Sequence, residues 1–82
     1  MTLEIISAEE MLFTGEVSVV TLPGAKGEFT VLRNHAPLVS TLTAGNITYR
    51  DEQGKDGSTS VGGGVVVVKN NVITVCIYSS ES

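Results

Sequence analysis

The sequence has few of the residues from which catalytic and metal sites are built. It contains one cysteine, one histidine, two tyrosines, two phenylalanines and no tryptophan. One cysteine cannot form an internal disulfide, which suits a reducing compartment. A zinc site needs several cysteine or histidine ligands, and a general base needs a nucleophile or a substrate pocket beside it. We therefore expect a non-enzymatic protein that uses no metal and no cofactor.

Basic residues and long apolar runs are also scarce. Five basic residues against nine acidic ones give a net charge of −4, which makes a phosphate backbone a poor partner. The apolar runs are much shorter than the ~20 residues that cross a membrane. The N-terminus also lacks the basic and then apolar regions of a signal peptide. We expect neither nucleic-acid binding nor direct membrane insertion, so any membrane association must go through other proteins.

What the sequence does have is valine and short alternating runs. Hydrophobic residues make up 41% of the 82 residues, enough for one compact core, and β-branched side chains favour strands. The composition predicts an all-β fold, a flattened β-sandwich or barrel of two packed, mainly antiparallel sheets. Residues 1–82 form a single domain in which 79–82 are a polar tail. The strands are expected at residues 3–7, 16–22, 28–32, 38–43, 46–50, 58–61, 65–68 and 72–78.

Some of these strands carry specific expectations about their ends and partners. A Pro-Gly pair is expected to stop the second strand at Leu22, because proline fixes φ and glycine allows positive φ. The strands at 38–43 and 46–50 are expected to form a pair joined by a short turn. Residues 65–68, apolar on both faces, are expected to be covered on both sides. Cys76, in an apolar strand, is expected to be a buried thiol.

Three successive glycines at 62–64 invite comparison with a phosphate-binding loop. That loop needs a lysine and a serine or threonine directly after its last glycine, followed by a helix. Here valines follow, so a bend between strands is the better interpretation. From the residues alone, two other classes stay open. One is a small barrel that binds nucleic acid through exposed aromatic and basic side chains, and the other is a ligand-binding β-domain with a deep apolar pocket.

Several short motifs keep a fixed order along residues 3–78. They are Leu12-Phe13-x-Gly15-Glu16-Val17, Leu22-Pro23-Gly24-x-x-Gly27-Glu28-Phe29, Asn34-His35-Ala36-Pro37-Leu38, Gly62-Gly63 and Asn71-Val72-x-Thr74-Val75. Together they resemble the epsilon subunit of bacterial F-type ATP synthase. Two positions depart from it: Thr30 stands where many relatives carry glycine, and Arg33 where many carry proline.

The resemblance implies a function that the composition does not. It implies a non-catalytic central-stalk (rotor) subunit that couples rotation of the membrane c-ring to the gamma subunit during ion-driven ATP synthesis. Such a subunit is peripheral on the cytoplasmic face of the bacterial plasma membrane, held there through the complex. Carried over by motif, Lys26, Gly27 and Glu28 are expected to contact the c-ring, with His35 in a neighbouring loop as a further candidate.

The resemblance also bears on what surrounds the domain. Many relatives continue into a helical hairpin that can inhibit ATP hydrolysis, and no helical pattern here supplies one, so hairpin-based inhibition is not expected from this chain. Because subunits of permanent complexes expose apolar surface when isolated, residues 11–13 or 65–68 are expected to form an apolar patch.

Overall fold

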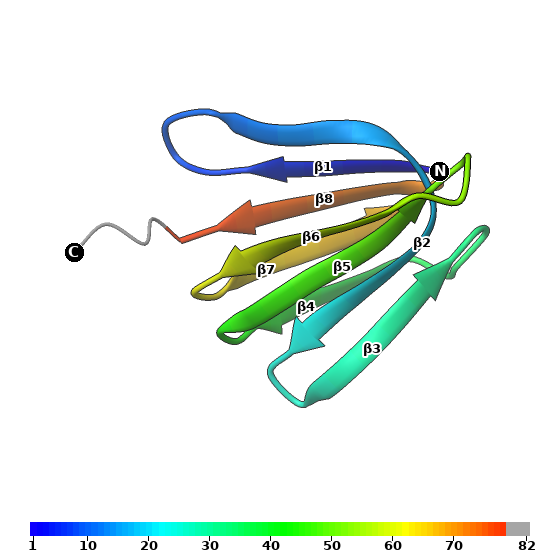
Figure 1. Ribbon diagram of the computed structural model, residues 1–82. Coiled ribbons are helices and arrows are strands. Elements are labelled where there is room, and N and C mark those ends of the chain that lie inside the picture. The colour runs from blue at the N-terminus through cyan, green and yellow to red at the C-terminus, as the bar shows by residue number, and fades with distance from the viewer. Residues whose placement is uncertain (79–82) are drawn as a thin grey trace.

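The computed structural model describes residues 1–78, and each regular element in that range is a β-strand (Figure 1). The predicted polar tail lies outside the described residues. The strands are β1 (Thr2–Ile6), β2 (Met11–Gly24), β3 (Gly27–Leu32), β4 (Leu38–Leu42), β5 (Gly45–Asp51), β6 (Asp56–Val61), β7 (Gly64–Lys69) and β8 (Val72–Ile77).

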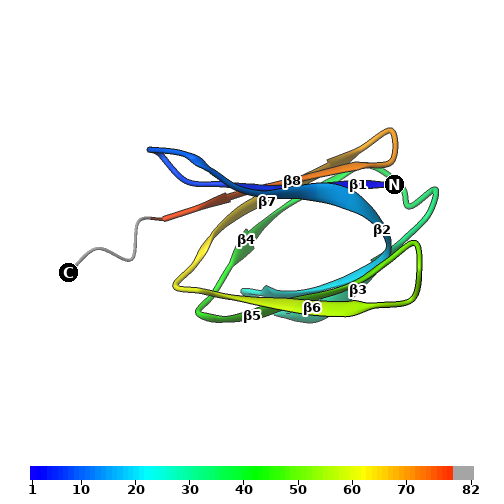
Figure 2. The same ribbon diagram turned by 45° about the horizontal axis from the view of Figure 1, so that its top comes forward.

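The long strand β2 organises the fold because it belongs to both layers. Its first half pairs with β1, and its second half lies between β3 and β5. Sheet A, defined here as the start of β2 with β1, β8, β7 and β4, faces sheet B, which holds β3, the end of β2, β5 and β6 (Figure 2). Only the β1–β8 ladder is parallel among the described strands. These two layers confirm the predicted flattened, mainly antiparallel sandwich.

Strict alternation within the strands fills the space between the sheets. In β8, for example, Ile73 and Val75 point inward and are fully buried, while Val72 and Cys76 point outward. Such alternation follows from the two-residue period of a strand. The buried core consists of Met1, Leu3, Ile5, Val17, Val20, Leu22, Val31, Leu42, Ile47, Val61, Val66, Val68, Ile73 and Val75.

Two predictions about strand ends and partners are wrong. β2 neither begins at Glu16 nor stops at Leu22: it runs from Met11, where it pairs with β1, through Pro23 to Gly24, with Pro23 opposite Glu28. β4 and β5 do not form a pair: β4 pairs with β7 and, at Leu42, with the end of β2, whereas β5 pairs with β2 and β6. The short link between them passes from sheet A to sheet B, which an alternation pattern in either strand cannot reveal.

Two predictions about burial are also wrong. β7 is covered on one side only, because Val66 and Val68 face the core while Val67 remains 39% exposed. Cys76 is exposed rather than buried. Both errors have one cause. Both strands belong to sheet A, which has nothing packed on its outer side within residues 1–78, so their outward apolar side chains stay exposed.

The turns lie where glycine and asparagine stand in the sequence. Residues 62–63 form the bend between β6 and β7, as expected of the glycine run. Asn70 and Asn71 form the β7–β8 turn with φ of 52° and 62°, a conformation that asparagine tolerates.

Candidate partner-binding surfaces

The turn between β2 and β3 carries three of the four residues that sequence comparison singles out. Lys26, Gly27 and Glu28 are all exposed there. Gly27 has a φ of 133°, which side-chain-bearing residues rarely adopt, so glycine is needed at this position. The Ala25 N–H donates to the Thr41 carbonyl at 3.0 Å, which fixes the turn to the end of β4.

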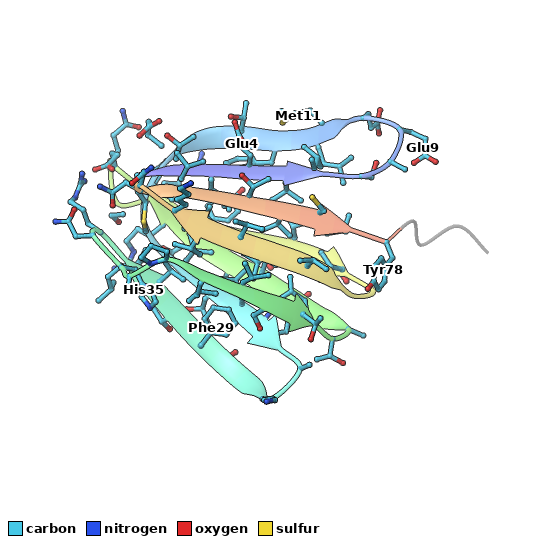
Figure 3. The ribbon with its side chains drawn as sticks, turned by 180° about the vertical axis from the view of Figure 1, so that it is seen from behind. Glu4, Glu9, Met11, Phe29, His35 and Tyr78 are labelled. Carbon is cyan, nitrogen blue, oxygen red and sulfur yellow. The ribbon has the colours of Figure 1, made fainter. Side chains whose placement is uncertain are left out.

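A groove of about 530 Å³ lies between this turn and β4. Its floor includes the half-buried ring of Phe29, which Figure 3 shows between β3 and β4. Val39, 72% exposed, forms part of the opposite wall. The motif match did not identify Val39 as a surface residue. The alternation of β4, in which Leu42 faces the core, is the signal that could have found it.

His35, the fourth predicted residue, is not near the other three. It follows β3, whereas Lys26, Gly27 and Glu28 precede or begin it, and the six residues of β3 span roughly 17 Å. The loop with His35 therefore lies at the end of the molecule that also holds the N-terminus, and the β2–β3 turn lies at the other (Figure 1). The structure does not bring all four residues into one contact.

The outer face of sheet A is rich in exposed apolar side chains. We call this the apolar face; Val67 lies directly across from Val39, and Met11 directly across from Ile6. Its exposed members are Met11 at 53%, Val39 at 72%, Val67 at 39%, Val72 at 36% and the Cys76 thiol. Glu4 and Thr74 lie among them and share a hydrogen bond of 3.4 Å. The expected patch at residues 11–13 or 65–68 is only partly present: Met11 and Leu12 are exposed while Phe13 is half-buried, and Val67 is exposed while Val66 and Val68 are buried.

The outer face of sheet B is polar. A row of hydroxyl side chains crosses it at Thr30, Thr21, Thr48 and Ser58, with the first two hydrogen-bonded at 3.0 Å. Beside this row, the Arg50 Nε donates to Asp56 Oδ1 at 2.8 Å. The two outer faces therefore differ: that of sheet A exposes valines, and that of sheet B exposes hydroxyls, an ion pair and, at its edge on β3, Leu32 at 56%.

The Arg50–Asp56 pair gives a prediction for pH dependence. The hydrogen bond and the positive charge of Arg50 hold the pKa of Asp56 below its ordinary value. A lowered folded-state pKa means that the pair's stabilisation is complete above the unfolded-state pKa and is lost as pH falls through the folded-state pKa. Asp56→Asn should thus unfold at nearly the wild-type temperature at pH 2 and slightly below it at pH 7. Thermal unfolding at both values checks this, and an NMR titration showing an ordinary Asp56 pKa would contradict it.

Within residues 1–78, no helix is long and apolar enough to cross a membrane. The same residues hold no group of three or more histidine, cysteine, aspartate or glutamate side chains placed to bind a metal ion.

Comparison with known proteins decides the family. Residues 1–82 match the family model described as "ATP synthase, Delta/Epsilon chain, beta-sandwich domain". The chain belongs to this family. The ATP synthase epsilon chains of Desulfatibacillum aliphaticivorans and Leptospira borgpetersenii are 37% and 40% identical to it, over 96% and 92% of its length. The resemblance inferred from the motifs is confirmed. The chain covers 56% and 58% of those two relatives, a little over half of each.

Chains in two solved ATP synthase structures share the fold. A chain of the mitochondrial ATP synthase of Euglena gracilis aligns with a TM-score of 0.84 and 26% identity, over 92% of this chain and 48% of that one. A chain from the central stalk and c-ring structure of the Tetrahymena thermophila enzyme aligns with a TM-score of 0.79 over 96% of this chain and 63% of that one. At 14% identity, the second match shows the fold alone.

Proposed function

We propose that this chain is a non-catalytic central-stalk subunit of a rotary ATP synthase, and that it couples rotation of the membrane c-ring to the gamma subunit during ion-driven ATP synthesis. Membership of the delta/epsilon-chain family supports the assignment of this chain to an ATP synthase complex. The observation that best supports a central-stalk role is the apolar face. Its five exposed apolar or thiol side chains lie on one sheet, as expected of a surface that another subunit covers.

The two surfaces suggest how the domain sits in the complex. In this proposal the apolar face contacts the gamma subunit, and the turn with Lys26, Gly27 and Glu28 contacts the polar loops of the c-ring. The groove beside that turn belongs to the c-ring contact, and Val39, which lines the groove and also belongs to the apolar face, lies at the border between the two contacts. The chain is then peripheral on the cytoplasmic face of the bacterial plasma membrane, held there by its partners. His35, at the opposite end of β3, is left to a different contact.

The architecture suits a part that transmits rotation. β2 runs through both sheets without interruption, so a force applied to one layer passes through covalent backbone into the other. The ladders around it tie sheet A and sheet B to the same strand. A closely packed core with interlocked side chains transmits strain instead of absorbing it. No chemical step is required of this chain.

Glu28→Ala tests the c-ring contact. Glu28 is exposed and could accept a charge-assisted hydrogen bond, which contributes about 1.5–3 kcal/mol, so its loss should weaken association with the c-ring about tenfold or more. Ion-driven ATP synthesis in reconstituted vesicles should fall accordingly, while the unfolding temperature stays unchanged. Gly27 is unsuitable for this test because its φ of 133° makes any substitution strain the turn.

Glu9→Ala is the matched control. Glu9 is also an exposed glutamate in a hairpin turn, but it joins β1 to β2, away from the groove (Figure 3). This variant should bind and couple like wild type. If Glu28→Ala synthesises ATP as well as Glu9→Ala does, Glu28 does not make the contact. If the wild-type chain fails to co-purify with gamma and c-ring, the central-stalk role itself is wrong.

A further inference from the structure

Two asparagines that belong to separate sequence motifs hold each other by their side chains. Asn34 follows β3 and Asn71 precedes β8, 37 residues later. The Asn34 backbone N–H donates to Asn71 Oδ1 at 2.7 Å, and Asn71 Nδ2 donates to Asn34 Oδ1 at 3.1 Å. The pair therefore joins the β3–β4 loop, residues 33–37, to the β7–β8 turn.

Asn71 also connects this pair to the first strand. Its backbone carbonyl accepts a hydrogen bond from the Thr2 N–H at 2.9 Å. A single residue thus uses its side-chain oxygen, its side-chain nitrogen and its backbone oxygen to join the loop, the turn and the start of β1. We call the Asn34–Asn71 pair the clasp, because it holds these three segments of the chain together.

The backbone conformation explains why both positions are asparagine. Asn34 has a φ of 65° and Asn71 a φ of 62°, in the left-handed region that asparagine and glycine enter most easily. Glycine would supply that conformation without a side chain. Asparagine supplies both the conformation and an amide with a donor and an acceptor, which the reciprocal pair requires.

We infer that the Asn34–Asn71 pair fixes the loop that carries His35, and that Asn71 is a positioning residue for a contact between this end of the domain and a central-stalk partner. The second half of this inference rests on the proposed function. Without the pair, the loop keeps the His35 N–H bond to the Leu32 carbonyl at 3.1 Å and the His35 Nδ1 contact with the Ala36 carbonyl at 2.7 Å, both local to the loop. Its other attachment is the Arg33–Glu52 ion pair at 3.2 Å, which joins two exposed side chains and so contributes little.

A fixed loop matters for binding because a partner selects the competent conformation. When only a fraction of molecules holds the loop correctly, the apparent dissociation constant rises by the inverse of that fraction. Loss of the clasp should therefore weaken binding without removing any group that touches the partner. This separates Asn71 from a contact residue such as the proposed Glu28.

Asn71→Gly is the test variant, since glycine keeps the positive φ and removes both side-chain bonds. Asn70→Gly is its control: Asn70 has a φ of 52°, and its side chain makes no hydrogen bond within residues 1–78. Hydrogen exchange by NMR should show at least a tenfold loss of protection at the Asn34 amide in Asn71→Gly, with core amides of β7 unchanged. Binding to a purified gamma subunit and c-ring should weaken about tenfold, and Asn70→Gly should match wild type in both measurements.

The outcomes separate the two halves of the inference. Unchanged protection of the Asn34 amide in Asn71→Gly overturns the clasp. Lost protection with unchanged binding overturns the positioning role, while the proposed function stands if Glu28→Ala still weakens binding. Failure of the wild-type chain to bind either partner overturns the proposed function and the positioning role together, and the exchange result then decides the clasp on its own.

Discussion

Replacing Gly64 with alanine is expected to lower the unfolding temperature by about 15 °C. Gly64 begins β7 and lies between Leu42 of β4 and Ile77 of β8. A Cβ added there would collide with the carbonyl oxygen of Cys76 and would lie 2.9 Å from the Ile77 Cα. Both are backbone atoms in a ladder, so they cannot rotate away as a side chain would. Overpacking of this kind costs up to about 3 kcal/mol, and each kcal/mol shifts a domain of this size by roughly 4–8 °C.

Gly62→Ala is the control for this prediction. It lies two positions earlier in the same glycine run, but a Cβ added to it meets no atom within 4 Å. Its unfolding free energy should change by less than about 0.5 kcal/mol. Thermal and urea unfolding followed by circular dichroism measure both variants. If Gly64→Ala unfolds at the same temperature as Gly62→Ala, the close approach of β7 and β8 is not as the structure describes.

The same glycine run shows what the sequence could predict. Glycines among valines predicted a bend between strands, and the structure has it at residues 62–63. Sequence alone could not distinguish Gly64, which allows two backbones to approach, from Gly62, which faces open space. That distinction depends on the position of β8 beside β7, which is a property of the tertiary structure. Local chemistry therefore predicted the bend, and the fold determines which of its glycines is indispensable.

Strand faces were predictable for a similar reason, and strand partners were not. The two-residue period of a strand separates Leu38, Ser40 and Leu42 from Val39 and Thr41, and the buried Leu42 shows which of the two sets faces the core. β4 pairs with β7 instead of β5 because the chain crosses from sheet A to sheet B between β4 and β5. Two residues of link, 43 and 44, carry no visible signal for that crossing.

The candidate sites divide in the same way. Lys26, Gly27 and Glu28 lie side by side and exposed where β2 connects to β3, and their contact with the c-ring stays a prediction. The motif also gave His35, in a neighbouring loop, as a further candidate, yet the extended strand β3 carries it to the end of the sheet opposite the other three. The Asn34–Asn71 pair could not be foreseen, since 37 residues separate its members and only the fold brings them together.

Val67→Asp is expected to weaken binding of the gamma subunit by about a hundredfold. Val67 lies near the middle of the apolar face, directly across from Val39 and beside Thr74. If gamma covers this face, the new carboxylate is removed from water without a positive partner, at a cost of about 3 kcal/mol or more. The unfolding free energy should fall by no more than about 1 kcal/mol, because the side chain points away from the core and only its strand propensity is lost. Surface plasmon resonance against purified gamma measures the effect.

Thr48→Asp introduces the same charge on the other side of the molecule. Thr48 is an exposed residue of the central strand β5, on the polar outer face of sheet B. Its variant should bind gamma with wild-type affinity if the apolar face is the interface. The reverse result, with Thr48→Asp impaired and Val67→Asp intact, would move the interface to sheet B. Equal affinity for both variants and wild type would mean that neither face is covered by gamma. The difference between the apolar face and the outer face of sheet B would then have to reflect binding to a different partner.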